Sequence, residues 1–210
     1  MSRSAERRRT TAETDVRVRL DLDGSGQAKV ATGVPFFDHM LSALAHHGLF
    51  DLEIEAEGDL EVDAHHTVED VGIVLGDVLQ QALGDRTGIE RFGTTFVPMD
   101  EALCQVSLDL SNRPYLAFSG SLGAAWVGHF DTALVEEFLR ALSVHGGITL
   151  HVQVHSGKNA HHIIEALFKA LGIALKQATR TDPRRSGVPS TKGSLVDNRT
   201  ATPYRTARSS

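Results

Sequence analysis

The sequence predicts an α+β protein made of two copies of one strand and helix unit, with the helices packed on one face of the sheets. Two observations support this. The segment 64–69 (AHHTVE) recurs as 160–165 (AHHIIE), and nine of nineteen positions in 64–82 are identical in 160–178. Strand-like alternation precedes each copy in the same order. Two such halves are expected to form one pseudo-symmetric domain.

Composition restricts the class of protein. The chain has 210 residues, of which 41% are hydrophobic and 23% charged, values typical of a soluble globular protein. A net charge of -6 argues against nucleic acid as the main partner. No apolar run approaches the ~20 residues of a membrane span, and no secretory signal is evident. The single cysteine, Cys104, suits a reducing compartment, so we expect a cytoplasmic location.

The first half begins with residues 1–12, which are polar and basic and are expected to form a flexible arm. Residues 15–22 alternate apolar and polar side chains, as in a half-buried strand, and a turn at 23–26 precedes an expected hairpin partner at 28–32. A helix is predicted from 39 to 47, ending at Gly48. A strand at 52–56 and a helix from the first AHHTVE segment complete this half.

The second half repeats these elements. Residues 18–22 (VRLDL) resemble 106–110 (VSLDL), and the same offset places Glu13 on Glu101. Residues 126–131 have no counterpart and are expected to be an insertion. We therefore predict a single catalytic domain at 13–195, with half-repeats at about 13–90 and 91–180 followed by a basic segment, and a disordered tail at 196–210.

The duplicated histidine motif predicts metal ligands. A histidine and a glutamate four residues later share one helix face, and the second histidine points roughly 100° away. His161 and Glu165 are half of one expected site, and His65 and Glu69 are half of another. The leftover imidazoles, His66 and His162, are expected to cross to the opposite sites.

A further ligand is expected at the equivalent positions His39 and Glu137, at the start of the preceding helix in each half. Histidine and carboxylate ligands suit zinc, manganese, iron or cobalt. More than four ligands and no thiolate favour Mn²⁺ or Fe²⁺. The alternative reading of the motif is a set of helix-capping histidines.

Basic and hydroxyl side chains suggest a phosphate site, because arginine forks and hydroxyls commonly bind phosphate. The candidates are Arg91, Arg113, Lys169, Ser190 and Lys192. Each alone is more often a solvated surface residue. Lys169 stands apart because it lies two turns after His161, on nearly the same helix face.

Six segments of the chain resemble a known protein family. The segments FFDHML (36–41), AHHTVED (64–70), PMDEAL (98–103), SNRPY (111–115), GKNAHHIIEALFKA (157–170) and PSTKG (189–193) are similar to imidazoleglycerol-phosphate dehydratase. The resemblance runs from about residue 11 to 195. It implies a ribosomal-protein-S5-domain-2-like fold and two Mn²⁺ per subunit. It also implies a homo-oligomeric 24-subunit shell with active sites at subunit interfaces.

By position, the resemblance implies one manganese on His39, His66, His161 and Glu165, and the other on His65, Glu69, His162 and Glu137. It implies phosphate contacts from Arg91, Arg113, Lys169, Ser190 and Lys192, and places Glu13 against the substrate. Two positions differ from the family pattern. The family commonly has histidine at the place of Glu137, and often glutamine at the place of Ala43.

The implied reaction is removal of water from imidazoleglycerol phosphate to give imidazole acetol phosphate, a hydro-lyase step of histidine biosynthesis. Glu13 and Glu165 are the candidates for proton transfer. Two other functions are a dinuclear metallohydrolase and a metal-storage shell. The first usually needs more carboxylates, and the second does not require the arginines to converge.

Overall fold

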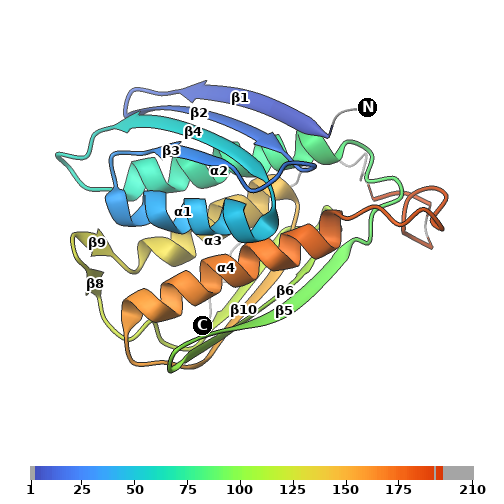
Figure 1. The fold of residues 1–210 in the computed structure, drawn as a ribbon. Coiled ribbons are helices and arrows are strands. Elements are labelled where there is room, and N and C mark those ends of the chain that lie inside the picture. Colours follow the sequence, from blue (N-terminus) through green and yellow to red (C-terminus); the bar gives the residue numbers. More distant parts are fainter. Residues whose placement is uncertain (1–2, 192, 196–210) are drawn as a thin grey trace, which may run out of the picture.

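The computed structural model describes residues 3–191 and 193–195. Two four-stranded sheets enclose a middle layer of helices (Figure 1). The predicted α+β duplication is therefore confirmed. Of the sequence-based predictions, Lys192 and the tail at 196–210 lie outside the described residues.

The first half contains β1 (Ser4–Thr10), β2 (Thr14–Asp21), β3 (Ala28–Ala31), α1 (Pro35–Gly48), β4 (Asp51–Gly58) and α2 (His65–Leu83). The second contains β5 (Phe92–Met99), β6 (Ala102–Asp109), β7 (Tyr115–Ser119), β8 (Trp126–Val127), β9 (Phe130–Asp131), α3 (Leu134–Gly146), β10 (Thr149–Ser156) and α4 (Ala160–Thr179).

The two halves share one topology. The strand order is β1-β2-β4-β3 in the first sheet and β5-β6-β10-β7 in the second. In both sheets the first three strands are antiparallel and the last is parallel to its neighbour. The ribbon β8–β9 is the expected insertion at 126–131, placed between β7 and α3.

Two sequence-based expectations about the first half were wrong. The expected flexible arm contains β1, which pairs with β2 along its whole length. Its sequence shows no apolar alternation because β1 is an edge strand whose inward arginines, Arg7 and Arg9, form ion pairs with carboxylates on α2. The expected hairpin partner at 28–32 is β3, which pairs in parallel with β4 and not with β2. The helix α1 connects these parallel strands, as parallel pairing requires a crossover.

The helical layer joins the halves. Helix α2 packs against α3, and α1 packs against α4, so each helix pair contains one member from each half. Gly76 and Gly172 occupy equivalent positions in α2 and α4. A Cβ at Gly76 would lie 2.7 Å from the Gly146 nitrogen, and one at Gly172 would lie 2.3 Å from the Leu44 oxygen. Glycine at these two positions therefore lets the helix backbones approach closely.

The outer faces of the two sheets differ in charge. The first sheet presents rows of charged side chains that form cross-strand ion pairs, such as Arg17 with Glu55 and Lys29 with Glu53. The second sheet presents uncharged aromatic residues, with Phe96 and Tyr115 more than half exposed. In the part of the chain that the structure describes, no helix has the length and apolar character needed to cross a bilayer.

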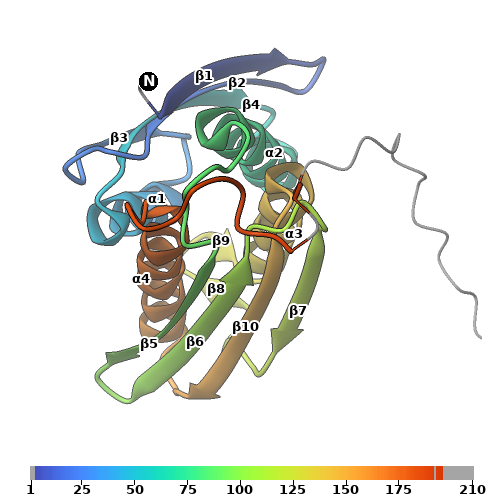
Figure 2. The same cartoon turned by 90° about the vertical axis from the view of Figure 1, so that its right-hand side faces the viewer.

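The end of the chain crosses the molecule. After α4, residues 180–191 run back across one end of the helical layer (Figure 2). Backbone hydrogen bonds join this segment to the linker between the halves, since Gly88 donates to Gly187 and Asp182 donates to Gly88. This path places the basic segment beside the start of β5 and the end of β6.

Candidate active site

A histidine and carboxylate cluster lies between α1 and α4. His39, on α1, and His161, at the first turn of α4, both point a ring nitrogen at Glu165. The Nε2 atoms of His39 and His161 lie 3.4 and 3.0 Å from Glu165 Oε2. The ligand atoms of the three residues are within 4.8 Å of one another. Two imidazoles and a carboxylate at this spacing suit a divalent cation, because imidazole nitrogens and carboxylate oxygens are common ligands of such ions.

Lys169 lies one turn after Glu165 and contacts its other oxygen. The Nζ to Oε1 distance is 2.8 Å, and the Glu165 side chain is only 11% exposed. Burial of Glu165 opposes ionisation, but the hydrogen bonds from Lys169 and His161 outweigh it and hold the pKa below its usual value. Glu165 is therefore held as a carboxylate anion, with one oxygen facing the histidines and one facing the lysine.

The second histidine of each motif points elsewhere. His66 Nδ1 lies 3.0 Å from Asp59 and 3.8 Å from Glu13. His162 Nδ1 lies 2.8 Å from Glu101. In one chain, therefore, neither imidazole joins the cluster of the other half.

The hydrogen bonds to these carboxylates raise the pKa of both histidines. Glu101 also accepts the amides of Lys158 and Asn159 at 3.1 and 2.8 Å. The bond from His162 and those from the two amides lower the Glu101 pKa to about 2. Glu101 is thus held rigidly as an anion.

The other expected site faces a large cavity. His65 begins α2, and Glu69 follows one turn later; both are half-buried. A cavity of about 840 Å³ is lined by His65 and Glu137, and by His129 of the β8–β9 ribbon. Glu137 also approaches Arg140 at 3.7 Å. The structure thus brings His65 and Glu137 to one cavity, but it does not gather a second tight cluster among the described residues.

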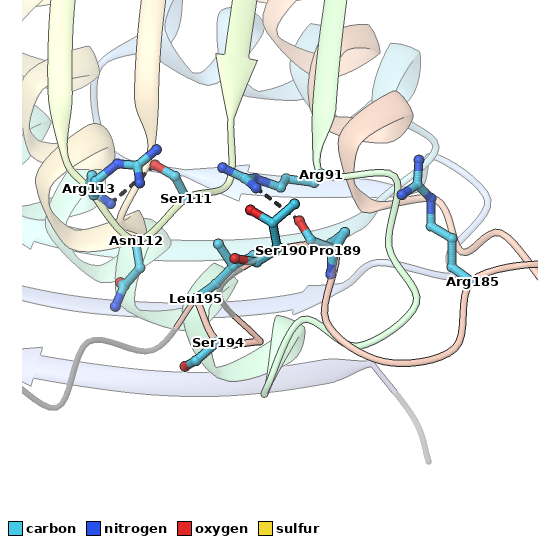
Figure 3. A pocket seen from close by; sticks show the side chains of 10 residues that line it. Arg91, Ser111, Asn112, Arg113, Arg185, Pro189, Ser190, Ser194 and Leu195 are labelled. Carbon is cyan, nitrogen blue, oxygen red and sulfur yellow. Dashed lines mark hydrogen bonds between the residues drawn. The ribbon is translucent and has the colours of Figure 1, made fainter.

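A basic pocket lies at the opposite end of α4. It has a volume of about 730 Å³, and its lining includes Arg91, Arg113 and Ser190 (Figure 3). The Arg91 guanidinium bonds Asp109 at 2.6 and 2.9 Å and the Pro189 carbonyl at 2.9 Å. Arg113 is largely exposed and lies 3.6 Å from the same aspartate. The pocket therefore presents one guanidinium fixed by hydrogen bonds and one that is largely exposed, a suitable pair for an anion.

The two sites are far apart within one chain. The Arg91 amide bonds the carbonyl of Ala178, near the end of α4, whereas Glu165 lies in its second turn. Thirteen residues of helix at 1.5 Å each separate them by about 20 Å. Lys169 lies with Glu165 and not with Arg91 and Arg113, although the sequence grouped all three as phosphate ligands.

Sequence reasoning missed three contributors. Asp59 is the main partner of His66, and Asp109 orients both arginines. Arg185 also lines the basic pocket. The signal for Asp109 was available, because it lies in the repeated VSLDL strand, two residues before the SNRPY segment. Asp59 lies in a loop with no periodic pattern, so only the fold reveals its contact.

This combination of duplicated fold, histidine and carboxylate cluster and basic pocket is that of an α+β protein suited to a divalent metal ion and an anionic small molecule. Residues 32–175 match the family model described as imidazoleglycerol-phosphate dehydratase. The enzyme of that name from Syntrophobacter fumaroxidans is 61% identical over 187 residues, covering 89% of this chain and 95% of the relative. The one from Acetivibrio thermocellus is 58% identical over 195 residues, covering 93% and 100%.

Solved structures agree with these relatives. The crystal structure of imidazoleglycerol-phosphate dehydratase from Staphylococcus aureus has a TM-score of 0.78 and 40% identity, covering 85% of this chain and 99% of that one. The Pyrococcus furiosus structure in complex with (S)-C348 has the same TM-score and identity, covering 90% and 99%. The chain therefore belongs to the imidazoleglycerol-phosphate dehydratase family, as its motifs predicted.

Proposed function

We propose that this chain removes water from imidazoleglycerol phosphate at a two-manganese site that is completed by other copies of the chain. Its family is one of hydro-lyases in histidine biosynthesis, and the dehydratase reaction follows from that membership. The observation that carries the rest is the cluster of His39, His161 and Glu165. A bound divalent ion supplies Lewis acidity that favours the anionic form of the substrate imidazole.

We assign His39, His161 and Glu165 to one metal ion, with His66 of another copy as a fourth ligand. His65, Glu69 and Glu137 are assigned to the second ion, with His162 of another copy. The positions of His66 and His162 support this assignment. Both rings are half-buried and contact carboxylates, Asp59 and Glu101, that lie outside the cluster of His39, His161 and Glu165. Manganese accepts both imidazole and carboxylate ligands, so Glu137 suits this site in place of a histidine.

The proton-transfer role falls to Glu13. Both oxygens of Glu165 are already occupied, one toward the histidines and one toward Lys169. The Glu13 carboxylate is 56% exposed and lies 3.8 Å from His66, so it faces the proposed metal-bound substrate. A carboxylate in this place can accept the carbon-bound proton or return a proton to the leaving hydroxyl. Glu165 is then mainly a ligand, held anionic by Lys169.

Arg91, Arg113, Ser190 and Lys192 are proposed to bind the phosphate. An imidazole ring, a three-carbon chain and a phosphate together span roughly 10 Å, about three extended residues. This length does not bridge the separation of about 20 Å between Glu165 and the basic pocket. The pocket of one chain is therefore proposed to serve the metal cluster of another, which supports a homo-oligomer and agrees with a 24-subunit shell. The uncharged aromatic face of the second sheet is suited to such contacts.

The cytoplasm is the proposed location, because the single cysteine, Cys104, is buried as a free thiol. A storage shell is the second candidate, and the convergence of Arg91, Arg113 and Ser190 argues against it.

The test is to incubate purified protein with imidazoleglycerol phosphate and Mn²⁺ and to follow the ketone product, with metal analysis and solution mass on the same sample. We expect turnover, two manganese ions per chain and a large assembly. Chelation should abolish turnover and lower the mass. A fully active, fully assembled protein without metal contradicts the proposal.

A further inference from the structure

A buried polar cluster lies beneath the β1–β2 turn that carries Glu13. It consists of Arg9, Thr14, Thr67 and Asp70, and we call it the Asp70 cluster. The Asp70 carboxylate accepts hydrogen bonds from the Arg9 guanidinium and the Thr14 hydroxyl. Thr14, Thr67 and Asp70 are 4%, 0% and 7% exposed. The Thr67 hydroxyl is buried and has no hydrogen-bond partner among the described residues.

The equivalent position in the second half of the fold is occupied by apolar residues. The two hairpins have the same register, with Arg9 opposite Val16 and Val97 opposite Cys104. A Cβ at Gly58 would meet Thr67 and Thr14, and one at Gly157 would meet Ile163 and Ala102. The equivalent pairs are thus Arg9 and Val97, Thr14 and Ala102, Thr67 and Ile163, and Asp70 and Ala166. Each of the four polar residues of the Asp70 cluster therefore has an apolar counterpart in the second half.

Stability alone does not account for this difference. An ion pair with a buried carboxylate is often no more stabilising than well-packed apolar residues of similar volume. The second half shows that the apolar set packs in this fold, since Ala102, Ile163 and Ala166 are at most 1% exposed. The polar set therefore has a role beyond holding strand and helix together.

The two hairpin turns hold their carboxylates differently. Glu101 is fixed through its own side chain, which bonds the amides of Lys158 and Asn159 and the ring of His162. The Glu13 carboxylate has no such anchor in the described chain, where the ring of His66 at 3.8 Å is its recorded ion-pair partner. Its position therefore depends on the backbone of the turn.

That backbone is tied to the Asp70 cluster. The Thr11 hydroxyl accepts the amides of Glu13 and Thr14 at 3.1 and 2.9 Å. The Thr14 side chain, next in the chain after Glu13, is held in turn by Asp70. Asp70 itself belongs to α2, the helix that begins at His65 and His66. The cluster thus links the turn of Glu13 rigidly to the helix that supplies the histidines.

We infer that the Asp70 cluster is a positioning device, which fixes the β1–β2 turn so that the Glu13 carboxylate stays beside His66 for proton transfer. The inference rests on the proposed role of Glu13. Arg9, Thr14 and Asp70 touch no reacting atom and act through Glu13. The second half needs no such device, because Glu101 is anchored by its own hydrogen bonds.

The test converts the first half into the second with the variant Arg9→Val, Thr14→Ala, Thr67→Ile and Asp70→Ala. We expect a folded, assembled protein whose kcat is at least about ten-fold lower while its KM changes little, because misplacement of a catalytic group costs rate more than binding. Wild-type kcat in this protein overturns the inference.

If the fourfold variant does not fold, Asp70→Asn provides the test, because the amide still accepts from Thr14 but loses its charge opposite Arg9. It should lower kcat at nearly constant KM, and an unchanged kcat overturns the inference. Arg7→Val is the matched control, since it removes a neighbouring β1–α2 ion pair, with Asp77, without touching the turn. It should retain wild-type kcat.

A double-mutant cycle with Glu13→Gln separates positioning from a merely structural role. If the cluster acts through Glu13, adding Asp70→Asn to Glu13→Gln should lower kcat no further. Losses that multiply overturn the positioning inference alone. A Glu13→Gln protein with wild-type kcat instead overturns the proton-transfer role of Glu13 itself.

Discussion

Mixed assemblies of two defective chains should regain activity if the active site is shared between copies. The first chain carries His161→Ala, which removes a proposed metal ligand. The second carries Arg113→Ala, which removes a proposed phosphate contact that is largely exposed, so folding should stay intact. His161 lies at the start of α4, and Arg113 lines the basic pocket beside the other end of that helix, about 20 Å away, so one substrate cannot reach both in one chain. In a random one-to-one mixture, a site with both residues intact should form in about one quarter of cases, because each contribution is intact in half of the chains.

The assay measures product formation at a substrate concentration well below KM, where loss of phosphate binding is fully visible. The two proteins are dissociated with chelator, mixed, and reassembled with Mn²⁺, and native mass spectrometry checks that mixed assemblies have formed. We expect about one quarter of the wild-type rate, against little activity for either protein reassembled alone. If mixed assemblies form and the rate stays at the average of the two separate proteins, the site lies within one chain and the reasoning is refuted.

Three further predictions concern single positions. Arg113→Ala should raise KM with kcat preserved, because the phosphate it contacts does not react; steady-state kinetics that show a lower kcat at constant KM would contradict the assignment. Glu137→Ala should lose one of two metal ions whereas His129→Ala should keep both, and metal analysis giving the reverse would move the ligand role to His129. In metal-free protein, the Glu101 and His162 pair should stabilise fully between their usual pKa values of 4.5 and 6.5, because the pKa of Glu101 is lowered and that of His162 raised. Glu101→Gln should therefore lower the midpoint temperature of unfolding at pH 5. The difference should fade as the pH rises through the raised pKa of His162, and also as it falls through the Glu101 pKa of about 2. Thermal unfolding in chelator that shows a pH-independent difference would contradict this.

Local spacing alone predicted much of this protein. The duplicated AHHxxE segments, with the strand-like alternation that precedes each copy, predicted the two halves and the fold class. The family was indicated by the resemblance of these and the other quoted motifs to imidazoleglycerol-phosphate dehydratase. His161 and Glu165 follow the i,i+4 spacing of a helix, and the structure indeed places their side chains 3.0 Å apart. The presence of a half-buried strand at 15–22 also followed from period-two alternation, and the structure has β2 at Thr14–Asp21.

Other features depended on contacts between distant segments. The strand β1 looked like a flexible arm because its inward arginines find carboxylates on α2, and no local pattern shows such a partner. The direction of β3 was decided by the crossover through α1. The sequence grouped Lys169 with the phosphate ligands. Its i,i+4 spacing places it beside Glu165, and only the tertiary structure shows that Arg91 lies near the other end of α4.

What the sequence by itself determined is therefore the repeated unit, the chemistry of its ligands and the family. Only the tertiary structure decided which candidate ligands meet. It joined His39 to Glu165 across 126 positions of chain and turned His66 and His162 away from that cluster. The tertiary structure also revealed that the pseudo-symmetric halves differ inside, with Asp70 where the second half has Ala166. The physical reason is that the backbone period fixes which nearby residues share a face of a helix or strand. These contacts instead depend on packing between elements remote in sequence.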